Sequence, residues 1–191
     1  MLIDETYLEQ QFGIKPHRKR AVNKTHDARK AHANTLDGSG EVNAAQKAFK
    51  KIERLVAVRD RSVSEVTKRL KQDDFSSADI DEAIDRALRC NYLDDHRFAD
   101  ILIRSRLSAG RGVEGIKREL QDHQIDLVSC EALFDEYQAL YPSEFTRALD
   151  ALMKKPPRAK NKQQAAFSKL MRMGYSSAIA AAAARQWAET A

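Results

Sequence analysis

Apolar residues recur along this chain at an interval of fifty residues. Leu70, Leu120 and Leu170 mark the interval, and other apolar positions repeat in step with them. When residues 44–91 are laid over 94–141 and 144–191, eleven of the 48 columns are apolar in all three copies. Chance alone would give about three or four such columns at this apolar content. The chain therefore contains three homologous repeats.

Within each repeat the shared apolar columns step by three and four residues. This period indicates helix faces rather than strands. Each repeat is predicted to hold three helices, the middle one short. The expected helices cover 44–59, 63–73 and 77–90, then 95–109, 113–123 and 127–140, and finally 144–155, 160–173 and 177–189.

Polar residues stand where these helices are predicted to begin. Ser62 and Glu65 form the S-x-x-E pattern of a capping box at the start of a second helix. Ser76, Asp126 and Ser176 occupy equivalent positions, so a side chain can cap the third helix of every repeat. Seven Gly and four Pro in 191 residues are too few for a fold built from hairpins and tight turns.

A single three-helix unit of this size buries little apolar surface, so the units are expected to stack. The predicted fold is all-α: an elongated, curved tandem array of three three-helix repeats of about 50 residues each, preceded by a flexible N-terminal arm. The predicted boundaries are 1–43 for the arm, 44–92 for repeat 1, 93–142 for repeat 2 and 143–191 for repeat 3.

Charge is distributed unevenly along the chain. Its net charge is +5, yet residues 73–100 hold nine acids against three bases, and residues 151–188 hold eight bases and no acid. Such a chain is expected to present separate acidic and basic surfaces, suited to a polyanion or to a partner protein of complementary charge.

Basic residues recur in each repeat near the junction of the first two helices and along the second. Stacked repeats would align them on one side, where several phosphates could be neutralised together without regard to sequence. The alternative is an ordinary solvated helix face. The predicted basic face that would bind DNA or a partner comprises Arg59, Arg61, Lys68, Arg69, Arg104, Arg106, Arg111, Lys117, Arg118, Lys154, Lys155, Arg158, Lys160, Lys162, Lys169 and Arg172.

Signals for an enzyme, a cofactor or a metal are weak in this sequence. It has no phosphate-binding glycine loop, no HExxH and no GxSxG element, and its histidines are scattered. No run approaches the roughly 20 apolar residues of a membrane span, and Cys90 and Cys130 are expected to be small buried residues without a disulfide. We therefore expect a cytoplasmic, monomeric regulatory or adaptor protein with no catalytic residues, cofactor, metal or membrane contact.

Three segments resemble the bacterial RecX family of regulatory proteins. Val58 to Leu70 resembles the opening R-x-x-S-xx-E-[LV]-xx-[KR]-L, and Arg111 to Leu120 resembles G-x-x-x-I-x-x-E-L. Asn91 to Ala99 is similar to the family's most diagnostic stretch, Y-[LI]-[ND]-D-x-R-F-A. The chain departs from the family at Asp74 and Gln124, where members often have glycine; only Gly174 keeps it.

The diagnostic stretch falls at the junction of repeats 1 and 2. We expect Tyr92 and Phe98 to bury their rings between these repeats, Asp94 or Asp95 to cap the next helix, and Arg97 to pair with a nearby carboxylate. A structural joint is the first interpretation of the segment, and direct contact with a partner is the second.

The resemblance implies a protein that binds the filament of the RecA recombinase and restrains its recombinase, ATPase and coprotease activities, affecting DNA recombination, DNA repair and the SOS response. Groove coating and capping of filament ends both remain open, as does any role of residues 1–43. The main alternative is a helical protein that binds DNA without sequence preference and without RecA. A scaffold for another partner is a third hypothesis, and a metabolic enzyme is the last.

Overall fold

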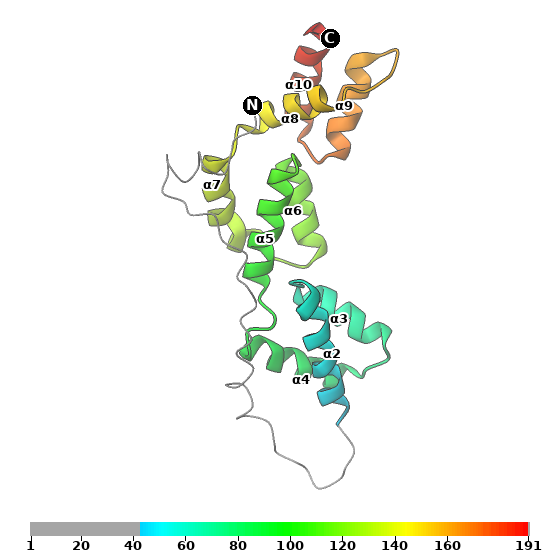
Figure 1. Cartoon of the computed structure of the whole chain (residues 1–191), viewed down its shortest axis with the longest axis vertical. Coiled ribbons are helices and arrows are strands. Elements are labelled where there is room, and N and C mark those ends of the chain that lie inside the picture. The colour runs from blue at the N-terminus through cyan, green and yellow to red at the C-terminus, as the bar shows by residue number, and fades with distance from the viewer. Residues whose placement is uncertain (1–42, 191) are drawn as a thin grey trace. The chain divides into compact units, whose positions relative to one another are not determined.

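The computed structural model describes residues 43–190, which are all-helical with no strand in that range (Figure 1). Repeat 1 contains α2 (Ala44–Val58), α3 (Val63–Gln72) and α4 (Ser77–Arg89). Repeat 2 contains α5 (Asp95–Ser108), α6 (Val113–Asp122), the short 3₁₀ turn η2 (Val128–Cys130) and α7 (Glu131–Leu140). Repeat 3 contains α8 (Glu144–Lys154), α9 (Lys162–Arg172) and α10 (Ser177–Thr190). The predicted all-α fold class is confirmed, and the predicted arm lies outside the described residues apart from Asn43, which caps α2.

Each group of three helices has its own hydrophobic core. The first core is built around Ile52, Leu70 and Ile80. The second contains Leu120 and Phe134, and the third contains Leu170 and Trp187. In Figure 1 the helices of each repeat accordingly lie together as one group. The fifty-residue apolar pattern therefore records three cores made by the same positions.

The third helix begins with the predicted side-chain cap in repeats 1 and 3, whereas in repeat 2 the equivalent Asp126 bonds to the short turn that precedes α7. Ser76 Oγ accepts a hydrogen bond from the Asp79 backbone N–H at 3.2 Å, and Ser176 Oγ accepts from Ile179 at 3.3 Å. Asp126 accepts from two backbone N–H groups, at 3.2 and 3.3 Å, and so starts η2 instead of a full α-turn. The prediction of one continuous helix over 127–140 is wrong at its first turn for this reason.

The capping box predicted at Ser62 is only half formed. Ser62 Oγ accepts from the Glu65 backbone N–H at 3.1 Å, as expected. The Glu65 carboxylate, however, pairs with Arg59 and Arg61 rather than returning to the cap. The carboxylate binds the two guanidinium groups in preference to the neutral backbone N–H because hydrogen bonds between oppositely charged groups are stronger.

The second helix of each repeat ends with a left-handed residue. Asp74 and Gln124 both have φ of 61°, and Gly174 has φ of 88°. In each repeat the next backbone N–H bonds back five residues to the conserved leucine column, for example from Ile125 to the Leu120 carbonyl at 3.0 Å. This is the Schellman termination that favours glycine, so Asp74 and Gln124 carry backbone strain that Gly174 does not.

The prediction that Cys90 is buried is wrong. Cys90 is exposed because it follows the last turn of α4 as its C-cap, after the buried face formed by Ala83, Ile84 and Ala87. Cys130, by contrast, is buried in the second core. No helix in residues 43–190 has the length and apolar content needed to cross a membrane.

Candidate functional site

Repeats 1 and 2 meet through polar contacts at the start of α3. Ser62 Oγ is hydrogen-bonded to Nδ1 of His123, which follows the end of α6, at 2.9 Å. The Val63 backbone N–H, a free donor at the start of α3, donates to Asp95 Oδ1 at 2.8 Å. Ser62 is fully buried. The joint therefore satisfies helix-end groups of one repeat with side chains of the next.

Arg97 of the family-like segment adds an ion pair to this joint. Its Nε donates to Oδ1 of Asp60 at 2.8 Å, and Asp94 lies 3.7 Å from its guanidinium. Asp94 is also the N-cap of α5, because its Oδ1 accepts from the Arg97 backbone N–H at 3.0 Å. These three side chains thus tie the loop before α3 to the start of α5.

The two aromatic rings of the segment lie differently from the prediction. Tyr92 packs against the first core, with its ring centroid 5.8 Å from that of Phe49. Phe98 is buried in the second core, 4.8 Å from the His123 ring. Each ring therefore belongs to the core of its own repeat.

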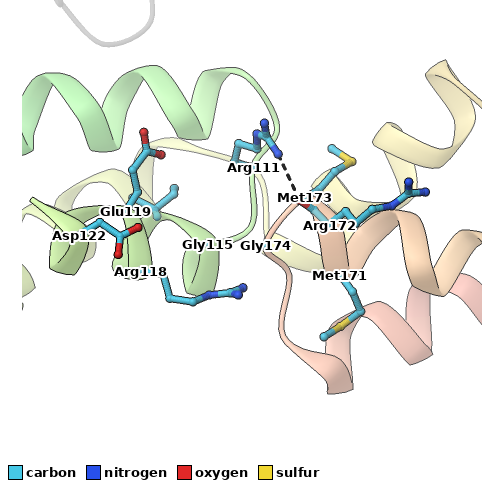
Figure 2. A pocket seen from close by; sticks show the side chains of 10 residues that line it. Arg111, Gly115, Arg118, Glu119, Asp122, Met171, Arg172, Met173 and Gly174 are labelled. Atoms are coloured by element: carbon cyan, nitrogen blue, oxygen red, sulfur yellow. Dashed lines mark hydrogen bonds between the residues drawn. The ribbon is translucent and has the colours of Figure 1, made fainter.

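Repeats 2 and 3 meet through direct contact of their backbones. The Gly112 N–H donates to the Met173 carbonyl at 3.1 Å, and the Gly115 N–H donates to the Gly174 carbonyl at 2.8 Å. A Cβ atom at Gly115 would lie 2.7 Å from the Cα of Gly174, and one at Gly112 would lie 2.4 Å from the Gly174 carbonyl carbon. Only glycine permits this approach. Figure 2 shows Gly115 and Gly174 facing each other across the joint.

Two side chains reinforce the glycine contact. Tyr175, buried in the third core, donates its hydroxyl proton to the Gly110 carbonyl at 2.8 Å, and burial raises its pKa to about 12. Glu144 accepts from the Val113 backbone N–H at 2.8 Å, as Asp95 does from Val63. A carboxylate on the first residue of the following repeat's first helix therefore accepts from the start of the second helix in both joints.

The two joints use the same ends of the second helices. In both, a basic side chain also donates to the last carbonyl of the next repeat's second helix, at 3.4 Å. Ser62–His123 and Gly112–Met173 join equivalent positions fifty residues apart. Val63–Asp95 and Val113–Glu144 share only the valine position, and Lys68–Asp122 and Arg111–Arg172 share only the position of the carbonyl.

A surface hollow of about 410 Å³ lies beside the glycine contact. Arg111 and Arg118 of repeat 2 and Arg172 of repeat 3 line it, together with Met171. Figure 2 shows these side chains arranged around Gly115 and Gly174. The structure therefore brings three members of the predicted basic face into one place.

Four other members of the basic face have carboxylate partners. Arg59 and Arg61 pair with Glu65, and Arg69 lies 3.7 Å from Asp73. Arg106 binds both carboxylate oxygens of Glu119, at 2.7 and 2.5 Å, and this hydrogen bonding lowers the pKa of Glu119. These guanidinium groups are partly neutralised within the protein.

Lys169 has a structural role at the C-terminal end of α8. Its Nζ donates to the carbonyls of Ala151, at 2.6 Å, and of Lys155, at 2.5 Å, which end α8. Burial, and then the charge of Lys155, lower the pKa of the Lys169 ammonium. Lys117 is half-buried, with its Nζ 5.8 Å from the Phe134 ring centroid.

The remaining bases of the predicted face are exposed. Within residues 43–190 none of them has a carboxylate oxygen within 4.0 Å, so their charges are free to bind an anion. They are Lys68, Arg104, Arg111, Arg118, Lys154, Lys155, Arg158, Lys160, Lys162 and Arg172.

The joint glycines are functional positions that the apolar pattern does not mark. Gly112 and Gly115 lie in the G-x-x-x-I-like segment, but their contact with Gly174 joins residues about sixty positions apart. In the described part of the chain no group of three His, Cys, Asp or Glu side chains is placed to hold a metal ion.

Comparison with known proteins gives one family. Residues 48–86 match the family model described as RecX, first three-helix domain. The chain is 32% identical over 127 residues to the regulatory protein RecX of Vibrio parahaemolyticus, covering 64% of this chain and 79% of that protein. It is 33% identical over 97 residues to regulatory protein RecX of Haemophilus influenzae, covering 48% of this chain and 64% of that protein.

Two crystal structures share the fold. One, of a regulatory protein RecX, has a TM-score of 0.60 at 17% identity and covers 71% of this chain and 70% of its own. The other, RecX from Lactobacillus salivarius, has a TM-score of 0.56 at 18% identity and covers 76% of this chain and 97% of its own. The Vibrio relative, aligned over most of its length, identifies the family, and the shared helical fold agrees with it. This chain belongs to the RecX family of regulatory proteins.

Proposed function

We propose that this protein binds the RecA nucleoprotein filament and lowers its recombinase, ATPase and coprotease activities, thereby affecting DNA recombination, DNA repair and the SOS response. Family membership supports a regulatory role. The observation that carries the proposal is the set of ten exposed bases that have no carboxylate partner among residues 43–190, distributed over all three repeats. Uncompensated charge of this kind suits a nucleoprotein, because it gives sequence-independent affinity for phosphates.

The proposed division of surfaces follows the distribution of charge. The bases of the second helices and of residues 154–162 would face DNA phosphates, while the acidic segment 73–100 would face basic protein surface. Binding alone would bridge or obstruct neighbouring protomers, so no catalytic group is required. We place this activity in the cytoplasm and assign it to a monomer, which sedimentation of the purified protein would test.

DNA binding without RecA is the second candidate. It is favoured by the loop between α8 and α9, where Lys154, Lys155 and Arg158 are exposed and have no carboxylate partner among the described residues. If DNA binding were the whole function, the protein would bind any single or double strand, and the presence of a RecA filament would not raise its affinity.

The deciding experiment is a titration of RecA ATPase on single-stranded DNA. The protein is added from one tenth of the RecA concentration to ten times that concentration, and ATP hydrolysis is expected to fall. An unchanged rate over this range would contradict the proposal. A gel shift of the same DNA with and without RecA shows whether binding requires the filament.

Charge variants separate the two candidates. The triple variant Lys154→Ala, Lys155→Ala, Arg158→Ala removes the loop bases. Its control, Lys47→Ala, Lys50→Ala, Arg89→Ala, removes three exposed bases outside the predicted face. RecA inhibition that survives the loss of DNA binding supports filament binding. Inhibition that disappears in proportion to DNA binding supports the second candidate.

A further inference from the structure

The guanidinium groups around the glycine contact bond to backbone carbonyls, and no carboxylate of the described part of the chain pairs with them. Arg118 Nε donates to the Glu114 carbonyl at 3.2 Å, and Arg172 Nε donates to the Ser168 carbonyl at 3.3 Å. In both cases the acceptor is the carbonyl four residues earlier on the same helix. Carbonyl contacts of this kind orient a guanidinium and leave its full charge available.

Arg111 completes the group from the loop before α6. Its Nη1 donates to the Arg172 carbonyl at 3.4 Å, which the dashed line in Figure 2 marks. The two carboxylates that line the hollow do not balance this charge. Glu119 is already bound by Arg106, so Asp122 is the opposing group that remains among the lining residues.

The lining of the hollow is also partly apolar. The side chain of Met171 is 37% exposed there, and Ile116 and Met173 contribute further apolar surface. A thioether is soft and adaptable, and it packs well against flat rings. A hollow with guanidinium groups beside an exposed methionine fits an anion attached to a flat ring, which is the chemistry of a nucleotide unit.

We propose that this hollow binds a short stretch of single-stranded nucleic acid, with Arg118 and Arg172 each contacting one of two neighbouring phosphates and Met171 packing against an adjoining base. The proposal rests on the proposed function and assigns a defined position to its DNA contact. A single strand is preferred because its bases are unpaired and can leave the stack, whereas those of a duplex are stacked inside it.

The site is shared by two repeats, and this has a thermodynamic consequence. Arg118 lies on α6 and Arg172 on α9, so one strand bound by both links repeats 2 and 3. A ligand that binds only the folded joint must stabilise it. An oligothymidylate is therefore expected to raise the unfolding temperature of the wild-type protein.

The test is fluorescence anisotropy of labelled oligothymidylate, without RecA, at several salt concentrations. Each lost phosphate contact lowers the salt slope by about 0.7 for a single strand. The variant Arg118→Ala, Arg172→Ala should therefore bind about tenfold more weakly, with a slope smaller by about 1.4. The control variant Arg89→Ala, Arg185→Ala removes the same charge from exposed positions outside the hollow and should bind within about twofold of wild type.

Two further variants test the remaining features of the site. Asp122→Asn removes the opposing carboxylate and should bind the oligonucleotide about threefold more tightly. Met171→Ala should weaken single-strand binding about threefold without changing the salt slope, because it removes an uncharged contact. A matching duplex should be insensitive to Met171→Ala. The arginine variants are checked for folding by circular dichroism; if one fails to fold, Asp122→Asn decides the question.

The outcomes are separable from those of the RecA assay. Equal affinity and slope in the arginine variant and its control would overturn the site, even if wild type inhibits RecA. Wild-type protein that fails to bind the oligonucleotide would also overturn it. A smaller salt slope in the arginine variant but not in its control would support the site. If the wild-type protein left RecA ATPase unchanged at the same time, the site would stand and the proposed function would be contradicted.

Discussion

Gly115→Ala is expected to loosen the joint between repeats 2 and 3, although alanine is the better helix former. Gly115 lies in the first turn of α6, where alanine would favour the helix by about 0.5–1 kcal/mol. Against this, the new Cβ would lie 2.7 Å from the Cα of Gly174. A Cβ and a Cα are both positioned by the backbone, so rotation of a side chain cannot relieve this clash.

The cost can be estimated from the joint geometry. Restoring an ordinary carbon–carbon contact of about 3.5 Å requires the two backbones to part by about 0.8 Å. This takes the Gly115–Gly174 and Gly112–Met173 hydrogen bonds, now 2.8 and 3.1 Å, beyond useful length. Two bonds at about 1 kcal/mol each, together with disturbed packing of Tyr175, amount to about 3 kcal/mol. After the helix gain, the net loss is about 2 kcal/mol, or about 4–8 °C in Tm.

Urea unfolding followed by two probes provides the assay. Far-UV circular dichroism reports all helices, whereas the fluorescence of Trp187, the only tryptophan, reports the third core. In Gly115→Ala the two transitions should separate, because repeat 3 loses its support from repeat 2. Gly110→Ala is the matched control: its φ is 71° and no atom lies within 4 Å of the added Cβ, so both probes should shift together. A higher midpoint in Gly115→Ala would refute the reasoning.

Three further predictions concern strain, pH and the first joint. Asp74→Gly and Gln124→Gly should each raise the free energy of unfolding in urea by about 1 kcal/mol, because both residues now have φ of 61°; a loss of stability would contradict this. Burial, and then the bond to a carboxylate, raise the pKa of Tyr137 from 10.0 to about 12. Its folded pKa exceeds the unfolded value, so its contribution is complete below pH 10 and is lost as pH rises to 12; Tyr137→Phe should flatten that part of the stability–pH curve. A double-mutant cycle on Asp60 and Arg97 should give a coupling below about 1 kcal/mol, since both side chains are more than a third exposed, and a larger value would contradict this.

The helices could be predicted from the sequence because their signals are local. Apolar spacing and a capping serine place the second helix of repeat 1 at 63–73, and the structure has Val63–Gln72. The start of α7 was missed because Asp126 binds the next turn in a 3₁₀ arrangement, a choice between two short geometries that apolar spacing does not distinguish.

The joints could be predicted only in part. The segment from Asn91 to Ala99 indicated a structural joint, and Asp94 and Arg97 act in it as the predicted capping and pairing residues, although the two rings do not lie between the repeats. The glycine contact was not predicted, because glycine contributes nothing to an apolar pattern and its partner is distant in sequence. Lys169 was grouped with the exposed bases because no sequence pattern marks its carbonyl partners. Its ammonium caps the C-terminal end of α8 by binding two carbonyls.

The joints are directional. In each, one repeat supplies the beginning of its second helix, and the following repeat supplies the end of its own second helix. The turn at 73–75 and the start of α9 at 161–163 therefore correspond to unused halves of a joint, and within residues 43–190 neither makes a hydrogen bond to another repeat. Two molecules that associated through these halves would do so head to tail, a heterologous contact that grows into a ring or a filament rather than closing as a twofold pair.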